Sequence, residues 1–418
     1  MDSQELEKLL SSLRSAPPQT LLSSSALHAD PATVRLALEF LMDQGLNSED
    51  RSRLLDFLKD QPDLSIFDNQ MQYEGGGSAS LVSFDSLLGW LRKRARMRSS
   101  QEAAKELAEY LAAKEIPCLQ IVALGGIGVS ESTQITDEIS LVKPEDLPDC
   151  DAKESLMPQT GRPFLLSPVM TAALVRTVHE PKLHYPAGQP RALTAEIFPR
   201  SPSFEVLVDA SRLLAVAADA APVELAFWSM PAPSVPCAEQ STMTHFETTL
   251  SRFPITKELS NEDTMRAAEL LRGFRALSQP LQNRLRTPML RLSRAKRRRD
   301  LADAAAELGI ALESIFLDEN EHEEITYRLA TRAARFLEEP AERKQTLRLF
   351  SALYSVRSSA VHRGRVDGQL TRRQRKGLPE ELHQTEALLR YGYSAVARAL
   401  GKIIDAQAWP DWDSVVLE

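Results

Sequence analysis

The chain has 418 residues, of which 43% are apolar and 26% charged, a composition typical of an ordinary soluble globular protein with two or three domains. The first residues lack the basic and apolar regions of a signal peptide. No window of about eighteen residues is both apolar and uncharged, so no membrane span and no membrane partner are expected. The three widely spaced cysteines suggest a reducing compartment, and a cytoplasmic protein is expected. The net charge of −8 is uneven, because residues 1–250 carry 21 Lys and Arg against 34 Asp and Glu, whereas residues 251–418 carry 29 against 24.

Residues 1–74 are predicted to form an N-terminal helical segment. In SQELEKLLSSLRS and DPATVRLALEFLMDQG the apolar residues recur at i, i+3 and i+4, and Asp30 and Gly45 are a candidate helix cap and a candidate stop. The stretch EGGGSAS (residues 74–80) is rich in glycine and serine. It is therefore predicted to be a flexible linker or loop.

Residues 81–250 are predicted to form a mixed α/β region with short strands. It begins with two helical patterns, the second capped by Ser99 or Ser100. After Pro117 the apolar period changes, and CLQIVAL, GVSEST, ISLVKP, ALTAEIFP and PVELAFWSM are typical of short strands. In LGGIGVS no helix is expected after the glycines, as a dinucleotide-binding loop would require, so a hairpin turn is predicted there.

Residues 255–405 are predicted to form a helical bundle, followed by a C-terminal tail at residues 406–418. Five segments have helical periodicity and short connections. They are NEDTMRAAELLRGFRALSQPLQNRL, DLADAAAELGIALESIFL, EEITYRLATRAARFLEE, ERKQTLRLFSALYSVRSSAVH and EELHQTEALLRYGYSAVARALGKIID. The expected fold class is therefore mainly α: a C-terminal bundle preceded by a helical segment and a small mixed α/β region.

The stretch LYSVRSSAVHRGR contains the candidate catalytic residues Arg357 and His362, separated by small side chains that include Ser358. Arginine offers a planar fork of donors that suits phosphate oxygens, and histidine is the side chain best suited to proton transfer near neutral pH. Together they suffice for RNA cleavage without a metal, in which the 2′-hydroxyl attacks the adjacent phosphate. The alternative without a catalytic role is a surface arginine and a histidine at a helix end.

The order of three segments supports the catalytic interpretation. LGIALESIFL, EITYRLATRAARFL and RLFSALYSVRSSAVHRG follow one another at about twenty-residue spacing. This run resembles the HEPN superfamily and, within it, the Apea-like HEPN domains, whose hallmark is an Arg-x4–6-His motif near a late helix. The resemblance covers roughly residues 255–405. Arg357 matches the motif arginine and His362 the motif histidine.

The resemblance implies a metal-independent endoribonuclease, often of toxin–antitoxin or anti-phage systems, whose site forms at the interface of a homodimer. It implies RNA as the partner, with no cofactor and no metal. Many active members carry Asn, Asp or His after the arginine, where this chain has Ser358. A catalytically inactive HEPN module that binds RNA or a partner protein therefore stays open as the alternative, as does a pure assembly protein.

Glu313 lies in an apolar run, and a buried carboxylate needs a positive partner. Arg328 and Arg332 share one face of the next predicted helix, so a structural ion pair of Glu313 with Arg328 is predicted, with Arg332 as the other choice. The remaining hypothesis places Glu313 or Arg332 in the cleft beside Arg357, where Arg332 would contact substrate.

Two basic runs are candidate RNA-backbone contacts. RLRTPMLRLSRAKRRR (284–299) ends in Arg297, Arg298 and Arg299, and HRGRVDGQLTRRQRKG (362–377) includes Arg363 and Arg365. The acidic N-terminal half is a separate region that could take a regulatory partner or restrain the basic bundle. The three cysteines are far apart and predict neither a disulfide framework nor a zinc site.

Overall fold

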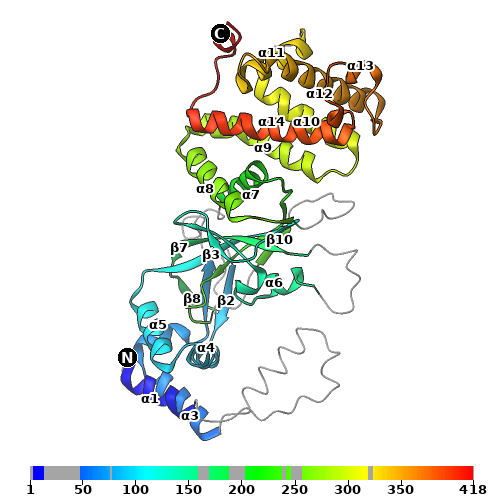
Figure 1. Ribbon diagram of the computed structural model, residues 1–418. Coiled ribbons are helices and arrows are strands. Elements are labelled where there is room, and N and C mark those ends of the chain that lie inside the picture. Colours follow the sequence, from blue (N-terminus) through cyan, green and yellow to red (C-terminus); the bar gives the residue numbers. More distant parts are fainter. Residues whose placement is uncertain are drawn as a thin grey trace, which may run out of the picture.

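The protein is mainly helical, with a small antiparallel sheet region in the middle of the chain (Figure 1). The computed structural model describes residues 3–13, 48–75, 78–158, 169–187, 203–237, 242–245, 257–318 and 323–417. The candidate cap Asp30, the candidate stop Gly45 and the strand candidate ALTAEIFP lie outside the described residues. In the described part of the chain, no helix combines the length and the apolar character that a membrane crossing needs.

Helices and strands of the N-terminal part form a small core of their own. The helices are α1 (Ser3–Leu13), α3 (Ser48–Lys59), α4 (Phe84–Met97) and α5 (Ser100–Ala112). Their apolar faces bury leucines such as Leu6, Leu54 and Leu91. The side chain of Ser99 accepts a hydrogen bond from the backbone N–H of Glu102 at the start of α5, which confirms Ser99 as the helix cap.

The predicted linker EGGGSAS is in fact part of a β-hairpin. Strands β1 (Gln70–Gly75) and β2 (Ser78–Val82) pair antiparallel, and β1 also pairs with β8 (His184–Pro186). Tyr73 and Val82, just outside the glycines, are buried and hold the two strands in register. Residues 74–75 and 78–80 therefore belong to paired strands, and burial of Tyr73 and Val82 is the physical reason that the linker prediction was wrong for them.

The central sheet is antiparallel, with strand order β10-β9-β3-β7-β6-β5. Its strands are β3 (Glu115–Gly125), β5 (Thr133–Gln134), β6 (Ile139–Val142), β7 (Ala172–Pro181), β9 (Val223–Pro231) and β10 (Thr242–His245). Both faces are covered, because Val122 and Leu124 of β3 belong to one core and Ile121 and Ala123 to another. This double burial explains why the middle of β3 is apolar without alternation.

The glycines of LGGIGVS make a turn but not a hairpin. Gly126 has φ 77°, a conformation that favours glycine, and no helix follows. The next strand, β4 (Ile127–Gly128), pairs in parallel with β11 (Lys257–Glu258) and not with β3. The exclusion of a dinucleotide-binding loop is therefore confirmed, whereas the hairpin is corrected.

Helix α7 (Glu205–Ala217) connects the sheet to the C-terminal bundle. It lies between the two in Figure 1 and packs against α8 (Asn261–Ala276) and α9 (Gln279–Arg297), the first two helices of the bundle. The short α6 (Asp151–Leu156) is associated with the core on the other face of the sheet. No helix was predicted at α7, most of whose side chains are buried.

The C-terminal bundle contains the five predicted helical segments, and it differs from the prediction in one divided segment and in two further short helices, α13 (Arg372–Arg375) and α15 (Trp412–Leu417). The other helices are α8 (Asn261–Ala276), α9 (Gln279–Arg297), α10 (Leu301–Phe316), α11 (Ile325–Leu337), α12 (Arg343–Arg363) and α14 (Thr385–Ala406). The first predicted segment is two helices, α8 and α9, because Pro280 starts a new helix more readily than it continues one. The predicted C-terminal tail carries α15, and the ring centroid of its buried Trp412 lies 5.4 Å from that of Phe316.

Candidate functional site

Arg357 and His362 both lie on α12, which ends where Gly364 adopts a left-handed conformation (φ 65°). They are five positions apart, so their side chains leave the helix axis in directions about 140° apart. Arg357 reaches the neighbouring helix α10, whereas His362 is exposed in the last turn. One chain therefore presents the two groups on different faces of one continuous helix.

The guanidinium of Arg357 is held by Glu313 of α10. Its Nη2 lies 2.9 Å from Oε1 and 3.1 Å from Oε2 of Glu313, and the side chains are 22% and 25% exposed. Tyr354 lies one turn earlier, with its ring centroid 5.4 Å from the guanidinium carbon. Burial, and then the Glu313 carboxylate, raise the pKa of Tyr354, so the phenol stays neutral. Arginine has five N–H donors, and several are not used by Glu313.

A glycine gives the arginine its path to α10. A Cβ at Gly309 would overlap the Cγ of Arg357 and would lie 3.1 Å from both its Cβ and its Cδ. Gly309 is one helical turn before Glu313, so both residues are on the same face of α10. The missing side chain at Gly309 therefore allows the long side chain of Arg357 to lie across α10 and reach Glu313.

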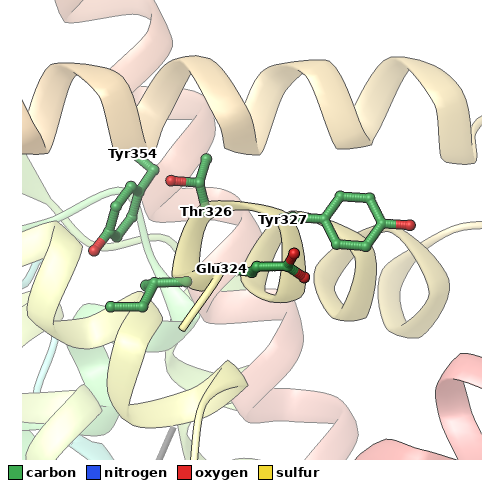
Figure 2. Close-up of a pocket in the computed structure, with 5 residues that line it drawn as sticks. Glu324, Thr326, Tyr327 and Tyr354 are labelled. Carbon is green, nitrogen blue, oxygen red and sulfur yellow. The ribbon is translucent and has the colours of Figure 1, made fainter. Parts of the chain in front are cut away.

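A surface pocket of about 610 Å³ includes Tyr354, the aromatic neighbour of Arg357, in its lining (Figure 2). It is lined by Tyr354 of α12 and by residues 324–327 at the start of α11. Figure 2 shows Tyr354 and Thr326 close together, while Tyr327 points away from them. A ligand in this pocket would contact Tyr354, whose ring separates it from the candidate catalytic arginine by a single side chain.

The predicted partner of Glu313 is corrected, because Glu313 pairs with Arg357 and the side chain of Arg328 is exposed. Glu313 therefore lies beside Arg357, as the alternative hypothesis placed it, whereas its role in a substrate cleft stays a prediction. Arg332 is buried, and its Nη1 donates a hydrogen bond to the carbonyl of Phe316 at 2.9 Å. Arg332 therefore stabilises the bundle and is not available as a substrate contact.

The basic run 284–299 lies in α9 and the turn after it, and most of its cations face acids of this chain. Ion pairs join Arg284 to Asp318 (3.1 Å), Arg286 to Glu205 and Asp209 (2.8 Å each), Arg291 to Glu307 (2.9 Å), Arg297 to Glu224 (2.7 Å) and Arg298 to Glu307 (3.6 Å). Three of these acids belong to the N-terminal half, so the two oppositely charged halves are in direct contact.

Lys296 of the same run is partly buried and also bonded within the chain. Its Nζ donates to the carbonyls of Ala215 and Ala218 at the end of α7, both at 2.7 Å, and burial lowers the pKa of Lys296 to about 8. Of the predicted RNA contacts, Arg297 is largely covered in its ion pair with Glu224, whereas Arg298 is 34% exposed and lies 3.6 Å from Glu307. Several cations of the run 284–299 therefore bind groups of α7 and of strand β9 in the central sheet.

The second basic run, residues 362–377, differs from the first because its cations do not pair with acids of the described chain. It follows His362 directly, continues through α13 and is largely exposed. Among the described residues, none forms an ion pair with its cations, which are Arg363, Arg365, Arg372, Arg373, Arg375 and Lys376. These positive charges therefore remain available to an anionic ligand next to His362.

Within the described ranges, no group of three or more His, Cys, Asp and Glu side chains is arranged to hold a metal ion. No family model, no curated protein and no solved structure matches the chain. The site is therefore interpreted from its own geometry. Sequence reasoning missed both Gly309 and Tyr354. The position of Gly309 one turn before Glu313 was a signal that could have indicated the glycine, and the sequence held no comparable signal for Tyr354.

Proposed function

We propose that residues 255–405 form a HEPN-type, metal-independent endoribonuclease in which Arg357 and His362 act on the scissile phosphate. One observation carries the proposal: α12 holds an oriented guanidinium and ends in an exposed imidazole, and the cations that follow directly have no acidic partner among the described residues. The toxin–antitoxin or anti-phage context rests on the resemblance alone.

The proposed reaction needs only groups of this protein and of RNA. The 2′-hydroxyl oxygen attacks the adjacent phosphorus while the bond to the 5′-oxygen breaks, which leaves a 2′,3′-cyclic phosphate and a free 5′-hydroxyl. A histidine accepts the proton of the 2′-hydroxyl, and a second proton donor protonates the leaving 5′-oxygen. Arg357, oriented by Glu313, donates hydrogen bonds to the non-bridging phosphate oxygens as negative charge develops.

A homodimer would complete this site. Because Arg357 and His362 point about 140° apart, one copy does not direct both groups at one phosphate. The outer face of α12 carries small side chains such as Ser358, and Val361 next to it is 53% exposed although it is apolar. A two-fold axis along this face would supply two copies of His362, one as base and one as acid.

The alternative function is a catalytically inactive HEPN module that binds RNA or a partner protein. The ion pair of Arg357 with Glu313 favours this alternative, because it neutralises the guanidinium in the absence of a ligand. Ser358 also differs from the residues of many active members of the family. In that case the cations of the run 363–376 would still bind RNA while no bond is cut.

Cleavage of labelled RNA by the full chain in EDTA tests the proposal. The wild-type protein is expected to cut, and His362→Ala is expected to cut about 10²–10⁴-fold more slowly with RNA binding retained. His245→Ala, which removes an exposed histidine from β10, is the matched control and should cut at the wild-type rate. RNA binding without any cleavage by the wild-type protein would select the inactive module, and equal rates for both variants would exclude His362 from the chemistry.

A further inference from the structure

A small polar pocket lies between α12 and the segment that follows it. Its volume is about 80 Å³, and Ser359 and Arg363 of α12 face Arg365, Asp367 and Gln369 of the segment across it. It lies on another side of α12 from the Arg357–Glu313 pair, since Ser359 and Arg357 diverge by about 160° around the helix axis. It is therefore distinct from the pocket at Tyr354.

The walls of this pocket are held by hydrogen bonds of the chain itself. The Nε2 of Gln374 in α13 donates to the Oγ of Ser355 in α12 at 3.0 Å. The Oγ1 of Thr385 donates to the carbonyl of Asp367 at 2.6 Å, and the backbone N–H of Leu370 donates to the carbonyl of His383 at 3.0 Å. The segment is thus fixed at both ends and in the middle, so the pocket is formed before any ligand binds.

Charge and donors identify the class of ligand. The guanidinium groups of Arg363 and Arg365 have no acidic partner among the described residues, and Gln369 adds a side-chain amide. Asp367 is the single carboxylate that lines the pocket, so the lining carries a net positive charge. Guanidinium groups bind phosphate oxygens in a two-pronged geometry, and the further cations of α13 extend the positive field.

The volume of the pocket indicates that it holds one phosphate group and not a longer piece of RNA. Since one water molecule occupies about 30 Å³ in the liquid, the pocket has the room of roughly two or three waters. That room suits a single phosphate group and is too small for a nucleobase. A terminal phosphate monoester also carries about −1.5 to −2 charges at neutral pH, more than the single charge of an internal diester.

We propose that this pocket binds the terminal phosphate of an RNA strand, an inference that rests on the proposed function in taking RNA as the ligand. Arg363 and Arg365 grip the phosphate, and Gln369 donates a further hydrogen bond. Because Arg363 follows His362 directly in α12, the strand end lies at a fixed distance from the reacting imidazole. Cleavage then occurs at a constant number of nucleotides from a phosphorylated end.

The test measures binding of the full chain to 2′-O-methyl RNA, which lacks the attacking hydroxyl and is not cut. Three versions of one oligonucleotide carry a 5′-phosphate, a 3′-phosphate or hydroxyls at both ends. We expect a phosphorylated end to bind about tenfold more tightly than the hydroxyl version, as charge-assisted hydrogen bonds of this kind are worth about one power of ten or more. Inorganic phosphate should remove this difference in affinity without weakening the binding of the hydroxyl version.

Two double variants test which residues cause the preference for a phosphorylated end. Arg363→Gln with Arg365→Gln is expected to abolish the difference between the ends. Arg372→Gln with Arg373→Gln removes the same charge from exposed residues that do not line the pocket, so it should weaken all three oligonucleotides alike and keep the difference. Loss of the difference in both variants would show a general effect of charge and would overturn the inference.

The outcomes separate this inference from the proposed function. Equal affinity of the wild-type protein for all three ends overturns the pocket assignment and leaves the ribonuclease proposal intact. Inorganic phosphate binding without any preference among the oligonucleotides assigns the pocket to free phosphate, which also overturns it. A preference for phosphorylated ends in a protein that never cuts RNA supports the pocket and overturns the ribonuclease.

Discussion

Arg357 and Glu313 join two helices of the bundle through an ion pair in which Nη2 lies 2.9 Å from Oε1. The pair connects α12 to α10 across 44 positions of sequence, at a site where both side chains are largely covered. Its value for the proposed chemistry is orientation, because a guanidinium held on one edge directs its remaining donors in fixed directions.

The first prediction concerns that orientation. Arg357→Lys keeps the charge but loses the planar fork, so cleavage should fall nearly as far as in Arg357→Ala, by about 10²-fold or more. Single-turnover cleavage at saturating RNA measures the effect. Arg390→Lys is the control, since the pair of Arg390 with Glu386 is exposed on both sides and should not affect the rate. Cleavage by the Arg357→Lys variant at the wild-type rate would mean that charge alone suffices.

The second prediction concerns the glycine under the arginine. Gly309→Ala places a methyl group on the Cγ of Arg357, so the side chain must leave Glu313. We expect a loss of about 1–3 kcal/mol in the free energy of unfolding and a loss of cleavage of at least about tenfold. Gly89→Ala in α4 is the control, because no atom lies within 4 Å of its added methyl group and a helical alanine is favoured by about 0.5–1 kcal/mol. Thermal unfolding measures the change in stability of both variants, and cleavage assays measure the change in their rates.

Helices of the bundle could be predicted from sequence because their apolar stripes recur at helical spacing. Pairing across the fold could not. The partner of Glu313 depends on how α10 packs on α12. Sequence proximity favoured Arg328 or Arg332 of the next helix, and the position beside Arg357 was only the second hypothesis. Charge density likewise did not separate the two basic runs, because the acids that pair with α9 are distant along the chain: Asp209 lies 77 positions from Arg286, and Glu224 lies 73 from Arg297.

The third prediction concerns the exposed cations of α13. Replacing Arg372 and Arg373 by Gln should weaken RNA binding and reduce the slope of log affinity against log salt by about 1.4, which is about 0.7 for each lost phosphate contact on single-stranded RNA. Titrations at several salt concentrations measure the slope. Arg294→Gln removes an exposed cation from α9, on the other basic run, and should change the slope less. An unchanged slope in the double variant would mean that α13 does not contact the backbone.

The fourth prediction concerns the proposed dimer. Val361 is apolar and 53% exposed on the outer face of α12, where a charged side chain in a two-fold interface would meet its own copy. Val361→Arg should therefore convert a dimer to a monomer and abolish cleavage. Met265→Arg, at a 66% exposed methionine of α8, should do neither. Sedimentation at tens of micromolar gives the mass, and a fully active wild-type monomer would remove the dimer from the mechanism.

The last prediction concerns the contact between the acidic half and the basic bundle. Arg297 of α9 pairs with Glu224 of β9 at 2.7 Å, and both side chains are 11% exposed. Burial raises the pKa of Glu224, but the Arg297 guanidinium and the hydroxyl of Ser211 lower it by more, so the net pKa lies below the usual 4.5. Arg297→Ala removes the ion-pair partner at 2.7 Å from a buried carboxylate, which keeps its hydrogen bond from Ser211, and should cost about 3–5 kcal/mol in the free energy of unfolding at pH 7.

This cost should depend on pH with a defined sign. In the wild-type protein a lowered carboxyl pKa contributes stability above about pH 4.5, which is lost as the pH falls through the folded-state pKa. In Arg297→Ala the largest of the groups that lower the pKa of Glu224 is gone, so its folded-state pKa lies above that of the wild-type protein and less of this stability is present at neutral pH. Denaturant unfolding should therefore give a small difference between the two proteins near pH 3 and the full difference at pH 7. Arg294→Ala on the same helix should differ by less than about 0.5 kcal/mol at either pH, and a pH-independent cost for Arg297→Ala would show that lost packing, not the charge of Glu224, is responsible.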